Sequence, residues 1–137
     1  MWWLYAILSA VFAALTAVLA KAGVQHINSN LATAIRTIVV LVMIWLIVLL
    51  RGEAKGLTSL PRQNLLLLGF SGLATGLSWI FYFKALAVGK VSQVAPVDKL
   101  SVALTIALSV IFLGETLTLK TAAGAILIIA GTLVLIL

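Results

Sequence analysis

Residues 1–20 read MWWLYAILSAVFAALTAVLA, an apolar run without a charged side chain. A helix rises about 1.5 Å per residue, so about 20 apolar residues cross the roughly 30 Å hydrocarbon core of a bilayer. No basic residue precedes this run, and it is longer than the apolar core of a signal peptide. The run therefore predicts a first membrane-spanning helix, with Trp2, Trp3 and Tyr5 as anchors at headgroup level.

Four further apolar stretches follow along the chain. The predicted spans cover approximately residues 2–20, 31–50, 65–83, 91–113 and 121–137. Their apolar residues are continuous instead of alternating, which disfavours the strands of a membrane barrel. We therefore predict an all-α integral membrane protein, a five-transmembrane-helix bundle that forms one domain over residues 1–137.

The composition agrees with this class of protein. Hydrophobic residues make up 64% of the chain and charged residues only 9%, against about 25% charged in soluble domains. The basic residues behind the net charge of +6 are scattered along the apolar runs, which favours the lipid bilayer over nucleic acid as a partner. Cysteine is absent, and one His with three acids offers no visible metal cluster or nucleophile–base pair. We expect no enzyme, no metal and no cofactor.

The charges at the ends of the spans are balanced between the two membrane faces. Five spans place the termini on opposite faces, and each face then carries four basic residues: Arg51, Lys55, Arg62 and Lys120 on the N-terminal face, and Lys21, Arg36, Lys84 and Lys90 on the other. The positive-inside rule therefore has little bias to act on. Insertion in both orientations, with assembly as an antiparallel pair, is one prediction, and a single orientation stays open.

The fourth span, VSQVAPVDKLSVALTIALSVIFL, carries two charges inside the apolar region. Asp98 and Lys99 lie about 12 Å from its first end at helical rise. Charges at that depth usually face a bundle interior or a wet cavity, so both are candidate substrate or coupling residues. Lys99 points about 100° away from Asp98, so the two need not pair with each other. The alternative is that both only lock helices together.

Other residues of this span support a transport site. Ser101 and Thr105 continue from Asp98 at helical spacing and form a small, hydroxylated face. Pro96 removes a backbone donor, and we predict it as a hinge of the kind found in the broken helices of transporters.

The third span contributes aromatic and small residues. Trp79 and Tyr82 are candidates for a cavity wall, although Tyr82 alone also suits an interfacial anchor. Gly72 and Gly76 form a GxxxG element, which predicts close helix packing. A similar seam of small residues in the fifth span contains Gly124 and Gly131, and it suits either the chain's own bundle or a second copy.

Arg36 lies too deep for a simple flanking residue. Residues 37–50 separate it from Arg51, about 21 Å at helical rise, which is shorter than the roughly 30 Å core. It must snorkel, thin the bilayer or sit buried. An ion pair with Asp98 is within reach, and snorkelling remains the alternative.

Three segments, KALAVGKVSQVAPVDKL (84–100), SVIFLGE (109–115) and GAILIIAGTLVL (124–135), resemble the EamA-type repeat of the drug/metabolite transporter superfamily. Most relatives contain two inverted five-span repeats around a central cavity and export solutes by alternating access. This chain contains one repeat and resembles the single-repeat bacterial and archaeal branch. The resemblance implies a multi-pass protein of the prokaryotic plasma (inner) membrane.

The resemblance also implies a function: transport of a small metabolite or drug-like solute by a homodimer. Four-span multidrug relatives carry an acid in their first helix, and this chain has none there. Asp98 is therefore the only carboxylate placed for proton coupling. The alternative function is a non-transporting membrane scaffold or an accessory subunit of a larger complex.

Overall fold

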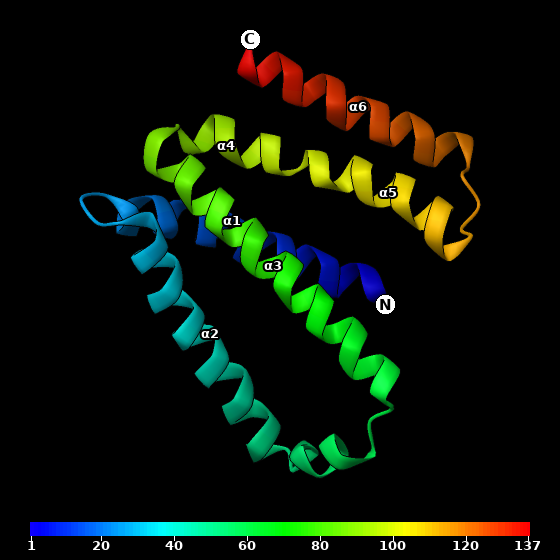
Figure 1. Cartoon of the computed structure of the whole chain (residues 1–137). Coiled ribbons are helices and arrows are strands. Elements are labelled where there is room, and N and C mark those ends of the chain that lie inside the picture. The colour runs from blue at the N-terminus through cyan, green and yellow to red at the C-terminus, as the bar shows by residue number, and fades with distance from the viewer. The chain divides into compact units, whose positions relative to one another are not determined.

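The computed structural model describes residues 1–137, and every element in it is a helix (Figure 1). In chain order these are α1 (Trp2–Val24), α2 (Ser29–Leu50), the 3₁₀-helix η1 (Glu53–Ser59), α3 (Arg62–Val88), α4 (Val91–Asp98), α5 (Leu100–Leu113) and α6 (Leu119–Ile136). The helices α1, α2, α3 and α6, and α4 together with α5, are each long and apolar enough to cross a membrane. The predicted all-α class and the five membrane spans are confirmed, and the chain is an integral, multi-pass membrane protein.

Four of the five predicted spans lie in helices that are longer than predicted: α1, α2, α3 and α6. α3 has 27 residues, whereas the predicted span covered residues 65–83. The difference arises because the apolar window marks the hydrocarbon core, while helical backbone continues into the polar headgroup region. The connection after α2 contains the seven-residue η1.

Local side chains explain where several helices begin and end. The Asn28 side chain accepts hydrogen bonds from the backbone N–H groups of Asn30 and Leu31, at 2.8 and 3.4 Å, and so caps the start of α2. The Thr118 hydroxyl accepts from the backbone N–H of Thr121 at 3.1 Å and caps α6. At the end of α5, Gly114 adopts φ +68°, a left-handed conformation that side-chain-bearing residues rarely adopt.

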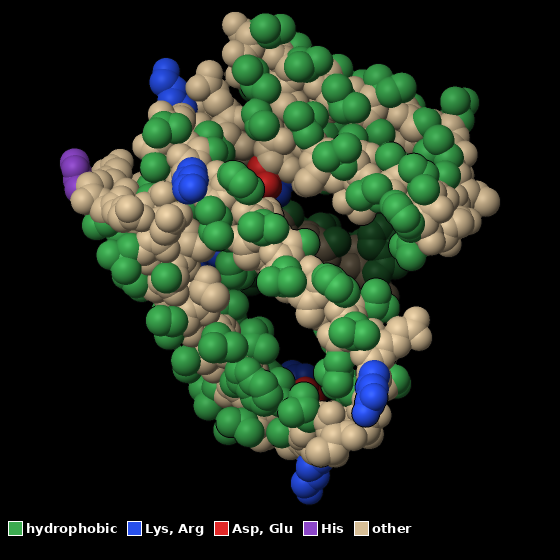
Figure 2. Space-filling view, viewed as in Figure 1, with side chains coloured by type: hydrophobic (Ala, Val, Ile, Leu, Met, Phe, Trp, Pro, Cys, Tyr) green, Lys and Arg blue, Asp and Glu red, His purple; other side chains and the backbone are tan.

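Large apolar side chains cover the outside of the helices. Leu66, Phe70 and Phe112 are 64%, 66% and 77% exposed. The buried apolar residues are few and mostly small: Ala17, Ala20, Val24, Ala32, Phe83 and Leu86. Figure 2 shows hydrophobic side chains over much of the visible surface, with Lys and Arg side chains standing apart from one another. A soluble protein of this size does not expose so much apolar surface, whereas lipid tails solvate it.

The contacts group the chain into two compact units. The first comprises residues 1–18 and 88–137 and is here called the α4–α6 unit; the second comprises residues 19–87 and is called the α2–α3 unit. In the α4–α6 unit both α4 and α5 pack against α6. There the Thr132 hydroxyl of α6 donates a hydrogen bond to the backbone carbonyl of Pro96 in α4 at 3.2 Å. The prediction of a single domain over residues 1–137 stays a prediction.

Within the α2–α3 unit, α2 and α3 lie closest where α2 begins and α3 ends, and they diverge toward η1 (Figure 1). At the closed end, the Lys21 ammonium at the end of α1 donates a hydrogen bond of 2.7 Å to the backbone carbonyl of Leu86. That carbonyl is one of the last four of α3, which have no partner within the helix. Phe83 and Leu86 are only 3% and 0% exposed, so this end of α3 is the best-packed part of the unit.

Candidate functional site

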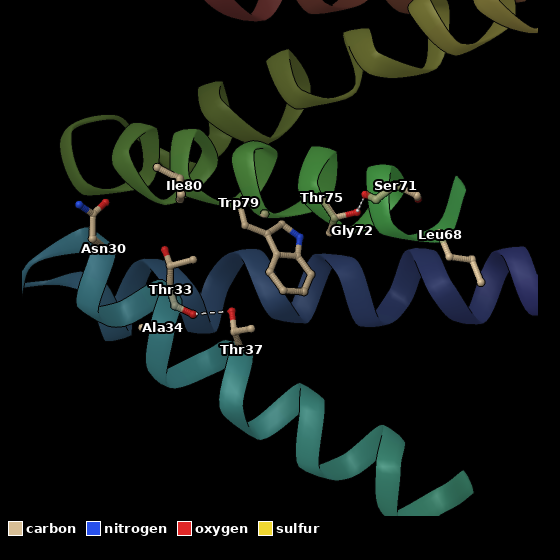
Figure 3. A pocket seen from close by; sticks show the side chains of 11 residues that line it. Asn30, Thr33, Ala34, Thr37, Leu68, Ser71, Gly72, Thr75, Trp79 and Ile80 are labelled. Atoms are coloured by element: carbon tan, nitrogen blue, oxygen red, sulfur yellow. Dashed lines mark hydrogen bonds between the residues drawn. The ribbon is translucent and has the colours of Figure 1, made fainter. Parts of the chain in front are cut away.

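A groove of about 720 Å³ lies between α2 and α3, toward the end where the two helices converge (Figure 3). Its walls come from Asn30, Thr33, Ala34 and Thr37 of α2, and from Leu68, Ser71, Gly72, Thr75, Gly76, Trp79 and Ile80 of α3. None of these residues is charged. The volume lies within the range of small-molecule sites, about 300–1,000 Å³.

The threonine hydroxyls of the groove bond to their own helices. Thr33 donates to the carbonyl of Ser29 at 2.8 Å, and Thr37 donates to the carbonyl of Thr33 at 2.8 Å. On α3, Thr75 donates to the carbonyl of Ser71 at 2.9 Å, and Figure 3 shows this bond and the one from Thr37. A hydroxyl has one hydrogen and two lone pairs, so each oxygen keeps acceptor capacity after this bond. These hydroxyls therefore suit a ligand that carries hydrogen-bond donors.

Arg36 of α2 stacks on two aromatic rings of α3. Its guanidinium carbon lies 4.2 Å from the centroid of the Trp79 ring and 5.7 Å from that of Phe83. The side chain is half-buried, and its Nη1 atom is buried without a hydrogen-bond partner. The ring contacts give the cation an electrostatic partner other than the predicted Asp98. They do not satisfy its N–H donors in the plane of the guanidinium.

Trp79 belongs both to the groove and to the Arg36 stack. Figure 3 shows its ring extending from α3 into the space toward α2. Tyr82, the other predicted wall residue, is half-buried and is not part of the groove lining. Phe83 was not predicted, because it is simply the last apolar residue of its span before Lys84 and has no polar group that marks it. Thr33 and Thr37 were missed as well, although hydroxyls one turn apart on the helix of a buried arginine were an available signal.

The glycines predicted for close helix packing have open space beside them. Gly72 and Gly76 line the groove, and a Cβ added at either position would meet no other atom within 4 Å. The same is true of Gly124 and Gly131 on α6. Close packing at these positions stays a prediction, and within this chain nothing approaches them closely.

In the α4–α6 unit, the predicted fourth span is interrupted at Lys99. Helix α4 ends at Asp98 and α5 begins at Leu100. The backbone N–H of Lys99 donates to the carbonyls of Ala95 and Pro96, at 3.3 and 3.0 Å, so the turn tightens three residues after the proline. The interruption therefore lies at Lys99, and the role of Pro96 as a hinge stays a prediction.

Asp98 and Lys99 form an ion pair beside this interruption. The Lys99 ammonium lies 3.2 Å from a carboxylate oxygen of Asp98, and the side chains are 56% and 35% exposed. Reasoning from an ideal helix suggested that the two residues need not pair, because neighbouring side chains diverge by about 100°. The structure does pair them, because the long lysine side chain reaches back to the carboxylate where α4 ends.

The roles predicted for the other residues of the fourth span stay predictions. Ser101 and Thr105 are exposed on α5. Arg36 and Asp98 belong to different units, so their ion pair stays a prediction. No group of three His, Asp or Glu side chains lies close enough to hold a metal ion.

Comparisons with known proteins agree with the predicted repeat. The model of the EamA-like transporter family matches residues 1–137. A Sinorhizobium protein named "Uncharacterized transporter in cobO 3'region" is 49% identical over 134 residues, which is 98% of this chain and 95% of that protein. An uncharacterized protein of Methanocaldococcus jannaschii is 47% identical over 58 residues, 42% of each chain. No solved structure matches the chain significantly.

The family match covers every membrane span, both helices of the interrupted fourth span and the groove between α2 and α3. The Sinorhizobium relative is well above the identity at which two proteins share a family, and it is covered nearly from end to end. The chain belongs to the EamA-like transporter family.

Proposed function

We propose that this membrane transporter moves a small metabolite or drug-like solute, and that two antiparallel copies form the pathway by alternating access. The family and the name of the Sinorhizobium relative support transport. The chain supplies five spans, which is one repeat of the kind that family members with two repeats carry twice. The plasma membrane is the proposed location.

The interrupted fourth span is the observation that carries this proposal. Pro96 has no N–H, so the helix before Lys99 lacks one regular backbone hydrogen bond, and a carbonyl without this donor at membrane depth is tolerated where protein or a water-filled cavity surrounds it, because lipid tails cannot hydrogen-bond it. The Asp98–Lys99 ion pair lies directly at the interruption, and both side chains are partly exposed. Charges inside a membrane usually mark ion and substrate pathways. We therefore expect a water-filled part of the pathway to surround the ion pair.

Asp98 is the proposed coupling residue. In one state of the transporter its carboxylate pairs with Lys99, as observed. In the alternate state it takes up a proton or pairs with Arg36. Proton uptake neutralises the carboxylate, which links the access state of the cavity to proton movement, whereas pairing with Arg36 only exchanges the cationic partner. Trp79, Tyr82, Ser101 and Thr105 remain the proposed wall residues.

A second copy is proposed because a single repeat leaves apolar helix surfaces on which another copy can pack. The seam of Gly124 and Gly131 on α6 has no close neighbour, and large apolar side chains surround it. The four-to-four balance of basic residues permits opposite orientations of the two copies. Small residues allow the close helix approach that stabilises contacts in lipid.

The test of this function is solute-evoked proton movement in proteoliposomes with a pH dye trapped inside. We expect the parent chain to respond to members of a panel of amines, organic acids and neutral metabolites. Asp98→Asn removes the titratable group, so it should reduce the response at least about tenfold while leaving assembly intact. Glu115→Gln is the matched control, since Glu115 is exposed beyond the end of α5.

Two results would contradict the proposal at different levels. An unchanged response of Asp98→Asn would remove Asp98 from coupling while leaving transport in place. Absence of flux across the whole panel, together with co-purification of one larger membrane complex, would favour the scaffold or accessory-subunit alternative.

A further inference from the structure

The positive charge of Arg36 has no carboxylate partner on the membrane-spanning helices of the α2–α3 unit. Residues 19–87 contain a single acid, Glu53, on η1 beyond the end of α2. That carboxylate lies 3.9 Å from Arg51. The membrane-spanning helices of the α2–α3 unit are therefore purely cationic near the groove, which favours negative charge there.

The aromatic stack holds the Arg36 side chain without using its hydrogen-bond donors. Trp79, at 4.2 Å, and Phe83, at 5.7 Å, offer ring faces to the cation. A guanidinium has five N–H donors that lie in its own plane, and a stacked ring leaves them free. The buried Nη1 atom has no partner at all. A buried donor without an acceptor is costly, so such an atom indicates a group that the site is built to receive.

The groove next to this stack complements the arginine. Trp79 is common to both, so a solute in the groove contacts the same ring on which Arg36 stacks. The groove lining is uncharged, and its threonine oxygens keep acceptor capacity because their hydrogens are bonded to backbone carbonyls. Arg36 is not itself among the lining residues and shares only Trp79 with the groove. It therefore supplies donors for an anion that lies against the Trp79 ring, while the hydroxyl oxygens suit ammonium or hydroxyl donors on the same solute.

We infer that Arg36 receives the carboxylate or phosphate oxygens of a small organic anion that occupies the α2–α3 groove against Trp79. This inference rests on the proposed transport function and names its substrate class. A planar guanidinium fixed by stacking matches a carboxylate in a bidentate geometry, which an ammonium does not reproduce. The hydroxyl oxygens around the groove favour an anion that also carries a hydroxyl or amino group.

The test measures equilibrium binding, so it does not depend on flux. The full chain is placed in phosphatidylcholine nanodiscs with Trp2, Trp3 and Trp45 changed to Phe, which leaves Trp79 as the only tryptophan. Benzoate, its uncharged analogue benzamide and the cation benzylammonium are titrated while Trp79 emission is followed. We expect benzoate to change the emission saturably, and the other two to require at least about tenfold higher concentration, since charge-assisted hydrogen bonds are the stronger ones.

Variants assign the effect to Arg36. Arg36→Gln should weaken the benzoate response at least about tenfold, and Arg36→Lys should restore it only in part because it keeps the charge and loses the planar fork. Arg62→Gln is the matched control: it removes the same charge from the same unit at an exposed position where α3 begins, and it should leave the response unchanged. An equal benzoate response in Arg36→Gln would overturn the inference, as would equal binding of benzamide.

Further experiments distinguish a soluble anion from two other possible partners of Arg36, a lipid headgroup and Asp98. If a lipid headgroup is the partner of Arg36, adding phosphatidylglycerol to the nanodiscs should abolish the benzoate response; we expect no change. If Asp98 is the resident counter-ion, benzoate should bind only after Asp98→Asn, which would also overturn the inference. Failure of both benzoate and inorganic phosphate to alter Trp79 emission would exclude the site. Benzoate binding without flux of any solute would instead contradict the proposed transport.

Discussion

At the scale of single residues, the α2–α3 unit places one arginine on two aromatic rings inside a membrane helix bundle. The contact between Arg36 and the rings of Trp79 and Phe83 supplies part of the electrostatic stabilisation that the cation loses on leaving water. It also fixes the position of a long and otherwise mobile side chain. Trp79 therefore contributes to stability as well as to the wall of the groove.

Replacing Trp79 should reveal this contribution. Trp79→Leu removes the nearer ring at 4.2 Å and should reduce stability by about 1–2 kcal/mol, the size of a partly desolvated cation–π contact. The measurement is the thermal unfolding midpoint in detergent, followed by circular dichroism. Trp45→Leu is the control, because Trp45 is 43% exposed on α2 and stacks on no cation. Equal midpoints for the two variants would show that the Arg36 stack stabilises nothing.

At the scale of the elements, the broken α4–α5 segment is held by a bond from α6. The Thr132 hydroxyl, on a residue only 4% exposed, donates to the carbonyl of Pro96 at 3.2 Å. That carbonyl lies in the last turn of α4, just before the interruption at Lys99, whose N–H bonds to the carbonyls of both Ala95 and Pro96. The bond therefore ties α6 to the last turn of α4, next to the interruption at Lys99.

Substitution of Thr132 tests whether this bond controls the break. Thr132→Val keeps the shape of the side chain and removes the donor, so it should destabilise the α4–α6 unit by about 0.6–1.7 kcal/mol, as found for interhelical hydrogen bonds in membranes. We also expect faster backbone hydrogen exchange around the interruption. Thr132→Ser retains the hydroxyl and should exchange like the parent. Identical exchange in Thr132→Val and Thr132→Ser would contradict a role for the hydrogen bond.

At the scale of the whole molecule, the chain has an exterior typical of membrane proteins, with leucine, isoleucine and phenylalanine side chains exposed along the helices. The sequence predicts four basic residues at each membrane face. Orientation in a membrane is set by the difference in basic residues between the two faces. A protein with no such difference is sensitive to a single added charge.

Added charges should therefore shift the orientation in opposite directions. For the parent with a C-terminal reporter fusion, we expect signal on both sides of the membrane. Gln63→Lys adds a positive charge at the N-terminal face and should retain that face in the cytoplasm, whereas Gln93→Lys, at the opposite end of the spans, should invert the bias. Signal from one side only in the parent, with no shift in either variant, would contradict dual insertion.

The fold class was predictable because it depends on local hydropathy. Each span is recognised by about 20 consecutive apolar residues. The charged residues Asp98 and Lys99, which the sequence singles out within the fourth span, lie where α4 ends and α5 begins. The ends of the helices were predicted less accurately, because residues such as Arg62 and Val88 are helical although they lie outside the apolar stretch that defined the span. Whether Lys99 pairs with Asp98 could not be decided from helical spacing, because it depends on the rotamer of the long lysine side chain.

The amino-acid sequence by itself determined that this protein crosses the membrane five times, because transfer of each segment into lipid depends on its own composition. Only the tertiary structure decided that Arg36 stacks on Trp79 and Phe83, and that Thr132 bonds to Pro96. Those partners lie on different helices, far apart along the chain. Their meeting depends on how helices converge and on side-chain rotamers, which no local pattern of apolar residues encodes.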